Sequence, residues 1–323
     1  MTNDSAFRTS LRVARLASAI AIASAGCGAQ SASGTLDMAA SGEAAAVDGY
    51  PSSTGVAYVD GWTMQWDFVL ISVGQFYLQT SDTDTTRPPL PEEDPVIINL
   101  HDAVLQNLWA FPGLPAQRYA NVGYQIFPPT ASSRRVGTVT DDHLNTMISG
   151  GIAYWLHGTA MHPSHHSVVL DLRIPMHTSM SDCMNAMDMT EGLVVTPNGM
   201  TNIQLTFHLD HVFFDSIVAP EPPIRFEAYA AAAGSDFVVT LDELASQPLA
   251  NLHDIDGSPL VDAMGAPIVY DPGSTPLATQ DLRSFVYHQA TTVGHFNGEG
   301  HCTYVCIDAS GATQPSCPAP PLH

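Results

Sequence analysis

The chain has 323 residues, and 45% of them are apolar, which is enough for the core of one large domain or two small ones. Its ten basic residues are all arginine, and 32 acidic residues give a net charge of −22. Such a surface repels nucleic-acid phosphates, so we expect no nucleic-acid partner. It attracts cations, although acidity also keeps a protein soluble.

The first 26 residues are typical of a secretory signal peptide. Three arginines precede the apolar stretch "LASAIAIASAG", which is too short to span a membrane. The small residues directly before Cys27 resemble the lipobox of bacterial lipoproteins, although Ser24 stands where that motif usually has leucine. In that family the cysteine carries the lipid. We therefore expect an exported chain, lipid-anchored in the cell envelope through Cys27 and facing the periplasm or the cell surface. A plain secreted protein is the alternative.

Residues 27–54 are rich in Ala, Ser and Gly and show no periodicity, which predicts a flexible tether. Short runs of β-branched and aromatic residues then alternate with Gly, Pro, Asn and Asp as far as residue 220, as in "MQWDFVLISVGQFYLQ". This pattern is typical of strands joined by turns. The fold class is therefore mainly β, and we expect an antiparallel β-sandwich or barrel over residues 55–220.

Residues 221–306 differ in pattern. "TLDELASQ" places Thr240 three residues before Glu243, which is a capping-box arrangement at a helix start. "TPLATQDLRSFVYHQATTV" has apolar residues at helical spacing. We expect a few helices here, in an extension packed on the β domain, followed by a C-terminal tail over residues 307–323.

Four cysteines follow Cys27, and an even number in an exported protein favours two disulfides among three possible pairings. A thiolate metal site at Cys302 and Cys306 is the alternative, but it needs reduced thiols in an oxidising compartment. Cys302 lies in a Gly-rich loop that needs a distant anchor, which Cys183 can supply. We therefore expect Cys183–Cys302, with Cys306–Cys317 closing a short terminal loop.

The stretch "FHLDHVFFD", residues 207–215, places His208 and His211 on either side of Asp210. If the preceding strand continues, His211 points inward with the apolar side chains. If the strand ends near Leu209 and a helical turn begins, the two imidazoles approach each other, as a chelate requires. Asp210 then either binds the metal or orients an imidazole.

A second pair, His295 and His301, lies in "GHFNGEGHC", where Gly298 and Gly300 permit a tight loop. We predict that these two histidines join His208 and His211 in one site for Zn(II) or Cu(II), since imidazole suits both ions. The alternative is a set of hydrogen-bonded histidines near a disulfide.

A second candidate metal site lies in a His- and Met-rich stretch between residues 162 and 189. Imidazole and thioether ligands together suit Cu(I), whereas methionine also serves as a soft core residue. The candidate ligands there are His162, His165, His166, Met176, His177 and Met180.

The segment "AAAAGSDFVVTLDEL" resembles the second half of an EF-hand loop, with Asp236 and Glu243 at ligand positions. Ala232 and Gly234 occupy the positions where the first carboxylates belong, and Phe237 replaces the turn glycine. We therefore expect no calcium site.

Two resemblances follow from longer strings. "TFHLDHVFFDSIVAPEPPIRFEAYA…VTLDELA" and "TVGHFNGEGHC" resemble a group of uncharacterised bacterial surface lipoproteins over roughly residues 56–302. That group joins a β-rich domain to an EF-hand-like acidic segment and a terminal Gly-His loop, and it implies no activity. "FYL…VIINLHDAV…PAQRYANVGYQI" is loosely similar to copper-binding lipoproteins encoded beside methanobactin genes. No ligand is transferred from that similarity.

We therefore expect a membrane-anchored lipoprotein that binds copper or zinc without catalysis, with an unknown protein partner. One alternative is a structural or interaction module without metal. Another is a zinc-dependent hydrolase in which Glu299 acts as base. No "HExxH", "GxSxG" or P-loop motif supports the hydrolase.

Overall fold

The computed structural model describes residues 32–81, 83, 95–186, 189–308, 310–314 and 317. The predicted signal peptide, the lipidation site Cys27 and parts of the predicted tether and C-terminal tail lie outside these residues. Among the helices of the described residues, none has the length and apolarity needed to cross a membrane.

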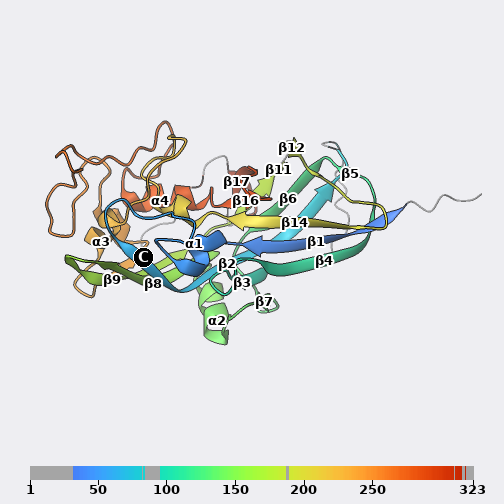
Figure 1. The fold of residues 1–323 in the computed structure, drawn as a ribbon, viewed down its shortest axis with the longest axis horizontal. Coiled ribbons are helices and arrows are strands. Elements are labelled where there is room, and N and C mark those ends of the chain that lie inside the picture. The colour runs from blue at the N-terminus through green and yellow to red at the C-terminus, as the bar shows by residue number, and fades with distance from the viewer. Residues whose placement is uncertain are drawn as a thin grey trace, which may run out of the picture. The chain divides into compact units, whose positions relative to one another are not determined.

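The first sheet has four strands in the order β16-β14-β1-β4. They are β1 (Ser33–Ser41), β4 (Gln106–Pro115), β14 (Met200–Phe207) and β16 (Gly294–Phe296). Figure 1 shows β14, β1 and β4 running side by side, although they come from distant parts of the chain.

The second sheet has ten strands, eight of them in the order β15-β9-β8-β2-β6-β10-β17-β18, with β3 and β7 paired beside β2. Its strands are β2 (Thr63–Gln79), β3 (Val96–Asn99), β6 (Asn121–Ile126), β7 (Arg134–Val136), β8 (Tyr154–His162), β9 (His165–Ile174), β10 (Thr178–Ser181), β15 (Val238–Thr240), β17 (Thr303–Ile307) and β18 (Thr313–Gln314). Two short pairs complete the strands: β5 (Arg118–Tyr119) with β13 (Leu193–Val194), and β11 (Met184–Asn185) with β12 (Thr190–Glu191).

The fold is mainly β and sandwich-like, as the sequence predicts, and both sheets end in edge strands within the described residues. It is not purely antiparallel, because β1 pairs with β14, β9 with β15 and β3 with β7 in parallel. One core cluster joins side chains of both sheets and of the helix near the C-terminus, including Leu36, Val69, Phe207 and Phe285. The opposite face of β2 packs under α2 through Leu70.

The helices are short. They are α1 (Glu43–Asp48), α2 (Asp141–Ser149), α3 (Glu227–Ala232), α4 (Leu282–Ala290) and the 3-10 helices η1 (Leu209–Phe213) and η2 (Glu243–Ser246). Three of them lie in the C-terminal third, as expected. The expected helix in "TLDELASQ" is only the 3-10 turn η2, and α1 and α2 occur earlier than the sequence indicates.

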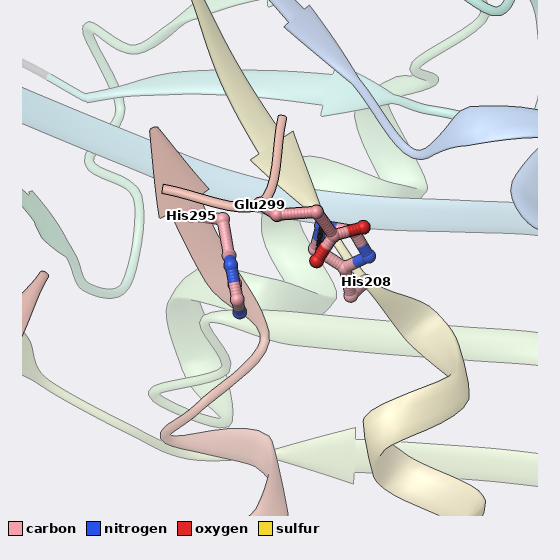
Figure 2. Close-up of side chains that lie close together, drawn as sticks. All are labelled: His208, His295 and Glu299. Carbon is pink, nitrogen blue, oxygen red and sulfur yellow. Dashed lines mark ion pairs between the residues drawn. The ribbon is translucent and has the colours of Figure 1, made fainter. Parts of the chain in front are cut away.

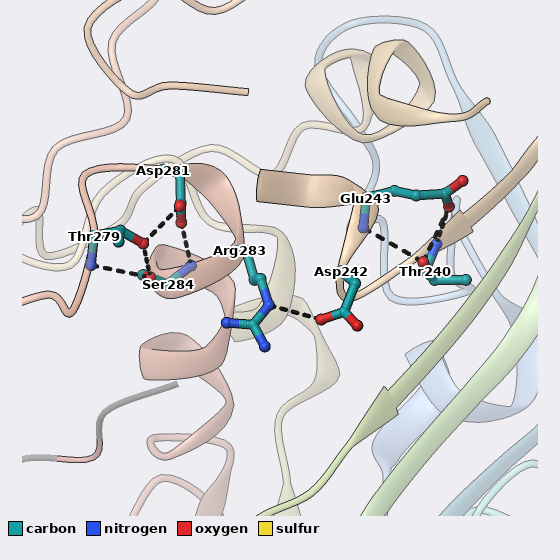
Figure 3. A network of polar contacts seen from close by, with 7 residues as sticks. All are labelled: Thr240, Asp242, Glu243, Thr279, Asp281, Arg283 and Ser284. Carbon is teal, nitrogen blue, oxygen red and sulfur yellow. Dashed lines mark hydrogen bonds and ion pairs between the residues drawn. The ribbon is translucent and has the colours of Figure 1, made fainter. Parts of the chain in front are cut away.

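Polar side chains fix where the C-terminal helices begin (Figure 3). Asp281 Oδ1 accepts the Ser284 amide at 2.8 Å and so caps α4. Thr240 and Glu243 form the predicted reciprocal pair, with the Thr240 amide donating to Glu243 Oε2 at 2.8 Å. An Arg283–Asp242 ion pair at 2.9 Å then ties α4 to the start of η2.

The prediction of a flexible tether over residues 27–54 is wrong where the structure describes it. Residues 33–41 form β1, the third of the four strands of the first sheet, and residues 43–48 form α1. Met38 and Ala40 are at most 1% exposed. Small residues indicate a linker in sequence, but here Ala39, Ala40 and Ser41 form the buried end of a strand between β14 and β4.

Both predicted disulfides are present, Cys183–Cys302 and Cys306–Cys317. The first ties the segment after β10 to the residue just before β17. Two disulfides fit a chain that folds in an oxidising, exported environment.

A matched pair of substitutions tests the place of β1. Ala40→Asp puts an unpaired carboxylate at a fully buried position, so we expect the free energy of unfolding to fall by about 3 kcal/mol or more. Ala32→Asp makes the same change at an exposed position and should stay within about 0.5 kcal/mol of wild type. Urea denaturation measures both, and equal small effects would support a tether instead of a strand.

Candidate metal centre

The His208–His211 pair forms because β14 stops just before it. Ile203, Leu205 and Phe207 alternate inward along β14, and the 3-10 helix η1 begins at Leu209. This is the second of the two alternatives for "FHLDH". The imidazole rings of His208 and His211 lie 5.5 Å apart between centroids and are nearly parallel.

The second histidine motif arrives beside the first through strand pairing. β16 pairs antiparallel with β14 and places His295 opposite Thr206, two residues before His208. Beyond β16 the chain turns sharply: Gly298 has φ of +85°, and a Cβ at Gly300 would lie 2.0 Å from the Met184 carbonyl oxygen. The glycines of "GHFNGEGHC" are therefore needed for the loop to close.

The predicted meeting of the two motifs is confirmed. The ring of His295 lies 4.4 Å from that of His208, 5.1 Å from that of His211 and 5.1 Å from that of His301, between centroids. All four histidines and Asp210 line a single cleft of about 790 Å³.

Two carboxylates complete groups of three donors. Donor atoms of His208, His295 and Glu299 lie within 4.8 Å of one another, and those of His208, Asp210 and His211 do so as well. Figure 2 shows the Glu299 carboxylate beside the His208 ring, with His295 on the neighbouring strand. His208 belongs to both groups and is therefore central to the cluster.

A third carboxylate comes from the segment expected to be a tether. β1 and β14 run parallel with Ser41 opposite Thr206, so Glu43 and His208 both lie two residues past a paired position. Glu43 Oε2 lies 3.4 Å from His208 Nδ1. Glu43 has φ of 56°, a left-handed conformation that costs a non-glycine residue about 1–2 kcal/mol.

His295 is a buried polar side chain whose hydrogen-bonding capacity is not fully satisfied. Its side chain is 3% exposed, and its Nδ1 has no hydrogen-bond partner among the described residues. An unmet buried polar atom costs about 1–3 kcal/mol. Burial, reinforced by His208 and His211, lowers the pKa of His295 to about 3, so the ring is neutral near pH 7.

His211 is fixed in one tautomer by its neighbour. The Thr292 hydroxyl donates to the Gln289 carbonyl at 2.8 Å, so its oxygen accepts from His211 Nδ1 at 2.9 Å. The lone pair of Nε2 then remains for a ligand, as in histidines oriented by a partner behind them. Burial, reinforced by His208, lowers the pKa of His211 to about 4.

The acidic groups shift in the opposite direction. Burial raises the pKa of Asp210 and of Glu43, and His208 opposes both shifts. Glu299 raises both further by like-charge repulsion. The cluster thus combines two imidazoles, His211 and His295, that resist protonation with carboxylates that repel one another. A bound cation offsets the repulsion between the carboxylates and takes up the lone pair of a neutral imidazole.

The six ligands of the second candidate site do not come together. His162 and His165 stack at 4.6 Å where the β8–β9 hairpin turns, whereas Met176 and His177 follow the far end of β9. At about 3.3 Å per residue, the ten-residue strand β9 separates these two ends by roughly 30 Å.

The other members of that set have separate roles. His166 packs on Phe237, with ring centroids 4.1 Å apart, and His177 Nε2 lies 3.0 Å from Gln125 Oε1. Met176 and Met180 are buried in the core. Met180 also lines the main cleft, so it is the one residue of this set that reaches the first site.

The carboxylates of the acidic segment after α3 accept hydrogen bonds from residues of the same segment. Glu243 Oε2 accepts from the Thr240 amide and hydroxyl, and Asp236 Oδ1 accepts the Val238 amide at 3.3 Å. The expectation of no calcium site there stays a prediction.

Sequence reasoning missed Glu43 and assigned Glu299 a catalytic role instead of a ligand role. Glu299 sits between the two histidines of its own motif, and that position was a usable signal. For Glu43 the signal was absent, because only the parallel pairing of β1 with β14 brings it to His208.

Comparisons with known proteins add no family to this site, since no protein-family model, curated protein or solved structure matches the chain.

The pKa values predict how stability of the metal-free protein changes with pH. His211 and His295 titrate near 4 and 3 in the fold but near 6.5 when unfolded, so the unfolded chain binds more protons between those values. The free energy of unfolding should therefore fall as pH drops below about 6.5, by up to about 1.4 kcal/mol per pH unit for each histidine. The raised pKa values of Asp210 and Glu43 work against this loss at the acidic end, because the folded protein takes up those protons more readily.

Urea denaturation of metal-free protein from pH 7.5 to 4.5 measures the slope. We expect His295→Gln to flatten it, and His162→Gln, at the distant hairpin, to leave it unchanged. An unchanged slope in His295→Gln would contradict the assignment of the effect to the cleft.

Proposed function

We propose that this protein is an exported, lipid-anchored envelope protein that binds a first-row transition ion, zinc or copper, in the cleft around His208, without catalysis. The observation that carries the proposal is the His295 ring, which has a buried nitrogen, Nδ1, without a partner among the described residues and which forms a three-donor group with His208 and Glu299.

The donor types support a borderline ion. Two imidazoles and a carboxylate are a common ligand set for zinc, and imidazole also suits copper. Magnesium and calcium prefer sites made of oxygen alone. Burial keeps His211 and His295 neutral near pH 7, so no proton has to leave these rings before a metal binds.

The spacing of the donor atoms also favours a metal site over a hydrogen-bonded network. His208 Nε2 lies 3.5 Å from the Gly298 carbonyl oxygen and 3.6 Å from Glu299 Oε2, both too long for a good hydrogen bond. Two ligand atoms on one tetrahedral zinc, each bonded at 2.0–2.1 Å, lie about 3.4 Å apart. The spacing in the cleft is therefore closer to that of ligands around an ion than to that of bonded partners.

Catalysis is left out of the proposal. The hydrolase alternative requires Glu299 as a base, but Glu299 is itself a donor in the three-residue group.

The proposed location in the cell envelope is inferred from the sequence and from the disulfides. The two cross-links fit an oxidising compartment outside the cytoplasm. Lipid attachment rests on the small residues before Cys27 alone.

Metal binding is tested with protein purified without a histidine tag. We expect wild-type protein to bind zinc or copper by calorimetry and to retain it through desalting. His295→Gln should weaken binding by more than about 100-fold, because it removes a ligand and not merely a residue behind one.

The matched control is His177→Gln, which makes the same change at a half-buried histidine whose partner is Gln125. It should bind like wild type. Wild-type protein that takes up neither ion, or two variants that lose binding equally, would refute the proposal.

Lipid anchoring has a separate test. Cys27→Ser removes the residue that would carry the lipid, so we expect the protein to move from the membrane fraction to the soluble fraction of the cell envelope. Membrane association that persists in Cys27→Ser would contradict the lipobox interpretation.

A further inference from the structure

We propose that the cleft holds two metal ions, one on each side of the His208 ring, with that ring as a bridge between them. The inference rests on the proposed metal binding and adds the number and the arrangement of the ions.

Each ring nitrogen of His208 faces its own carboxylate. Nδ1 lies 3.4 Å from Glu43 Oε2, and Nε2 lies 3.6 Å from Glu299 Oε2. Both distances are close to the separation of about 3.4 Å between two ligands of one tetrahedral zinc ion. The two nitrogens of an imidazole point in different directions, so a single ion cannot bind both.

The remaining donors divide between the two sides. We assign His295 and Glu299 to the ion at Nε2, because they form a three-donor group with His208. His301, whose ring lies 5.1 Å from that of His295, stands beside this position. The unpartnered Nδ1 of His295 gives this side a buried nitrogen without a hydrogen bond among the described residues.

Glu43, Asp210 and His211 remain for the ion at Nδ1. Asp210 and His211 form the second three-donor group with His208, and Glu43 approaches Nδ1 from α1. Thr292 occupies Nδ1 of His211, so its Nε2 is the atom left for a metal. This gives the second position the four protein ligands that a closed zinc site uses.

Donor count and charge both exceed what one ion uses. Seven side chains reach the cluster: four histidines and the carboxylates of Glu43, Asp210 and Glu299. A tetrahedral ion takes four ligands. Three carboxylates carry −3, so one divalent ion leaves −1, and two ions leave +1.

Loss of a proton from a bridging His208 ring removes the remaining charge of +1. A neutral His208 ring has one lone pair and one N–H, and the second ion takes the place of that proton, which goes to solvent. The ring then carries −1 and the cluster is neutral. Each step is a ligand exchange with no change of oxidation state, so no further reactant is needed.

Metal stoichiometry tests the inference. Metal-free full-length protein is titrated with zinc, desalted, and measured for zinc per chain by elemental analysis. We expect two zinc ions for wild type, one for Glu43→Gln and one for Glu299→Gln. His208→Ala should retain no tightly bound pair, because it removes the ligand common to both positions.

The matched control is Glu191→Gln, which makes the same substitution at an exposed glutamate of β12. It should retain two ions. Copper gives a second readout, since two Cu(II) ions joined through one imidazole ring couple magnetically. The paramagnetic resonance signal of the loaded protein should then be weaker than that of two isolated ions, and Glu43→Gln should restore an isolated signal.

The possible outcomes separate the two proposals. No bound zinc in wild type overturns metal binding itself. One ion in wild type, unchanged in Glu43→Gln, leaves metal binding standing and overturns the pair. Two ions that Glu43→Gln does not reduce, with uncoupled copper signals, place the second ion elsewhere and also overturn the pair.

Discussion

The register of three strands determines where the cluster forms. β14 lies between β1, its parallel partner, and β16, its antiparallel partner. Thr206 faces Ser41 on one side and His295 on the other, so backbone hydrogen bonds of the first sheet place His295 and bring the segments that carry Glu43 and His208 side by side. A slip of one residue in either pairing would turn the side chains to the opposite face and disperse the donors.

The structure around the end of β14 keeps two polar side chains buried and one glutamate in an unfavourable backbone conformation. The His208 and His295 side chains are at most 5% exposed, and Glu43 takes a left-handed conformation. The Cys183–Cys302 bridge anchors the loop that carries Glu299 and His301. Strain, burial and a cross-link gathered around unpaired donors are what a pre-arranged ion site requires, because the ligands are then ordered before the ion arrives.

Local patterns in the sequence predicted much of this arrangement. Alternation along β2 indicated strands, even cysteine number and spacing indicated the disulfides, and two compact histidine motifs indicated one cluster. The misses had a common physical origin. Small buried residues around Ala40 were indistinguishable from a linker, and Glu43 reaches His208 only through parallel pairing across about 160 residues, which no local pattern encodes. Conversely, His165 and His177 are near in sequence, but β9 holds them apart.

Crystallography at the absorption edge of the bound metal tests the central claim most directly, because anomalous scattering locates the ion without assumptions about its ligands. Crystals of zinc-loaded protein should give anomalous peaks in the cleft on both sides of the His208 ring, with imidazole nitrogens about 2.0–2.1 Å from each ion. Peaks confined to the His162–His165 hairpin, or an empty cleft in crystals that contain zinc elsewhere, would contradict the account.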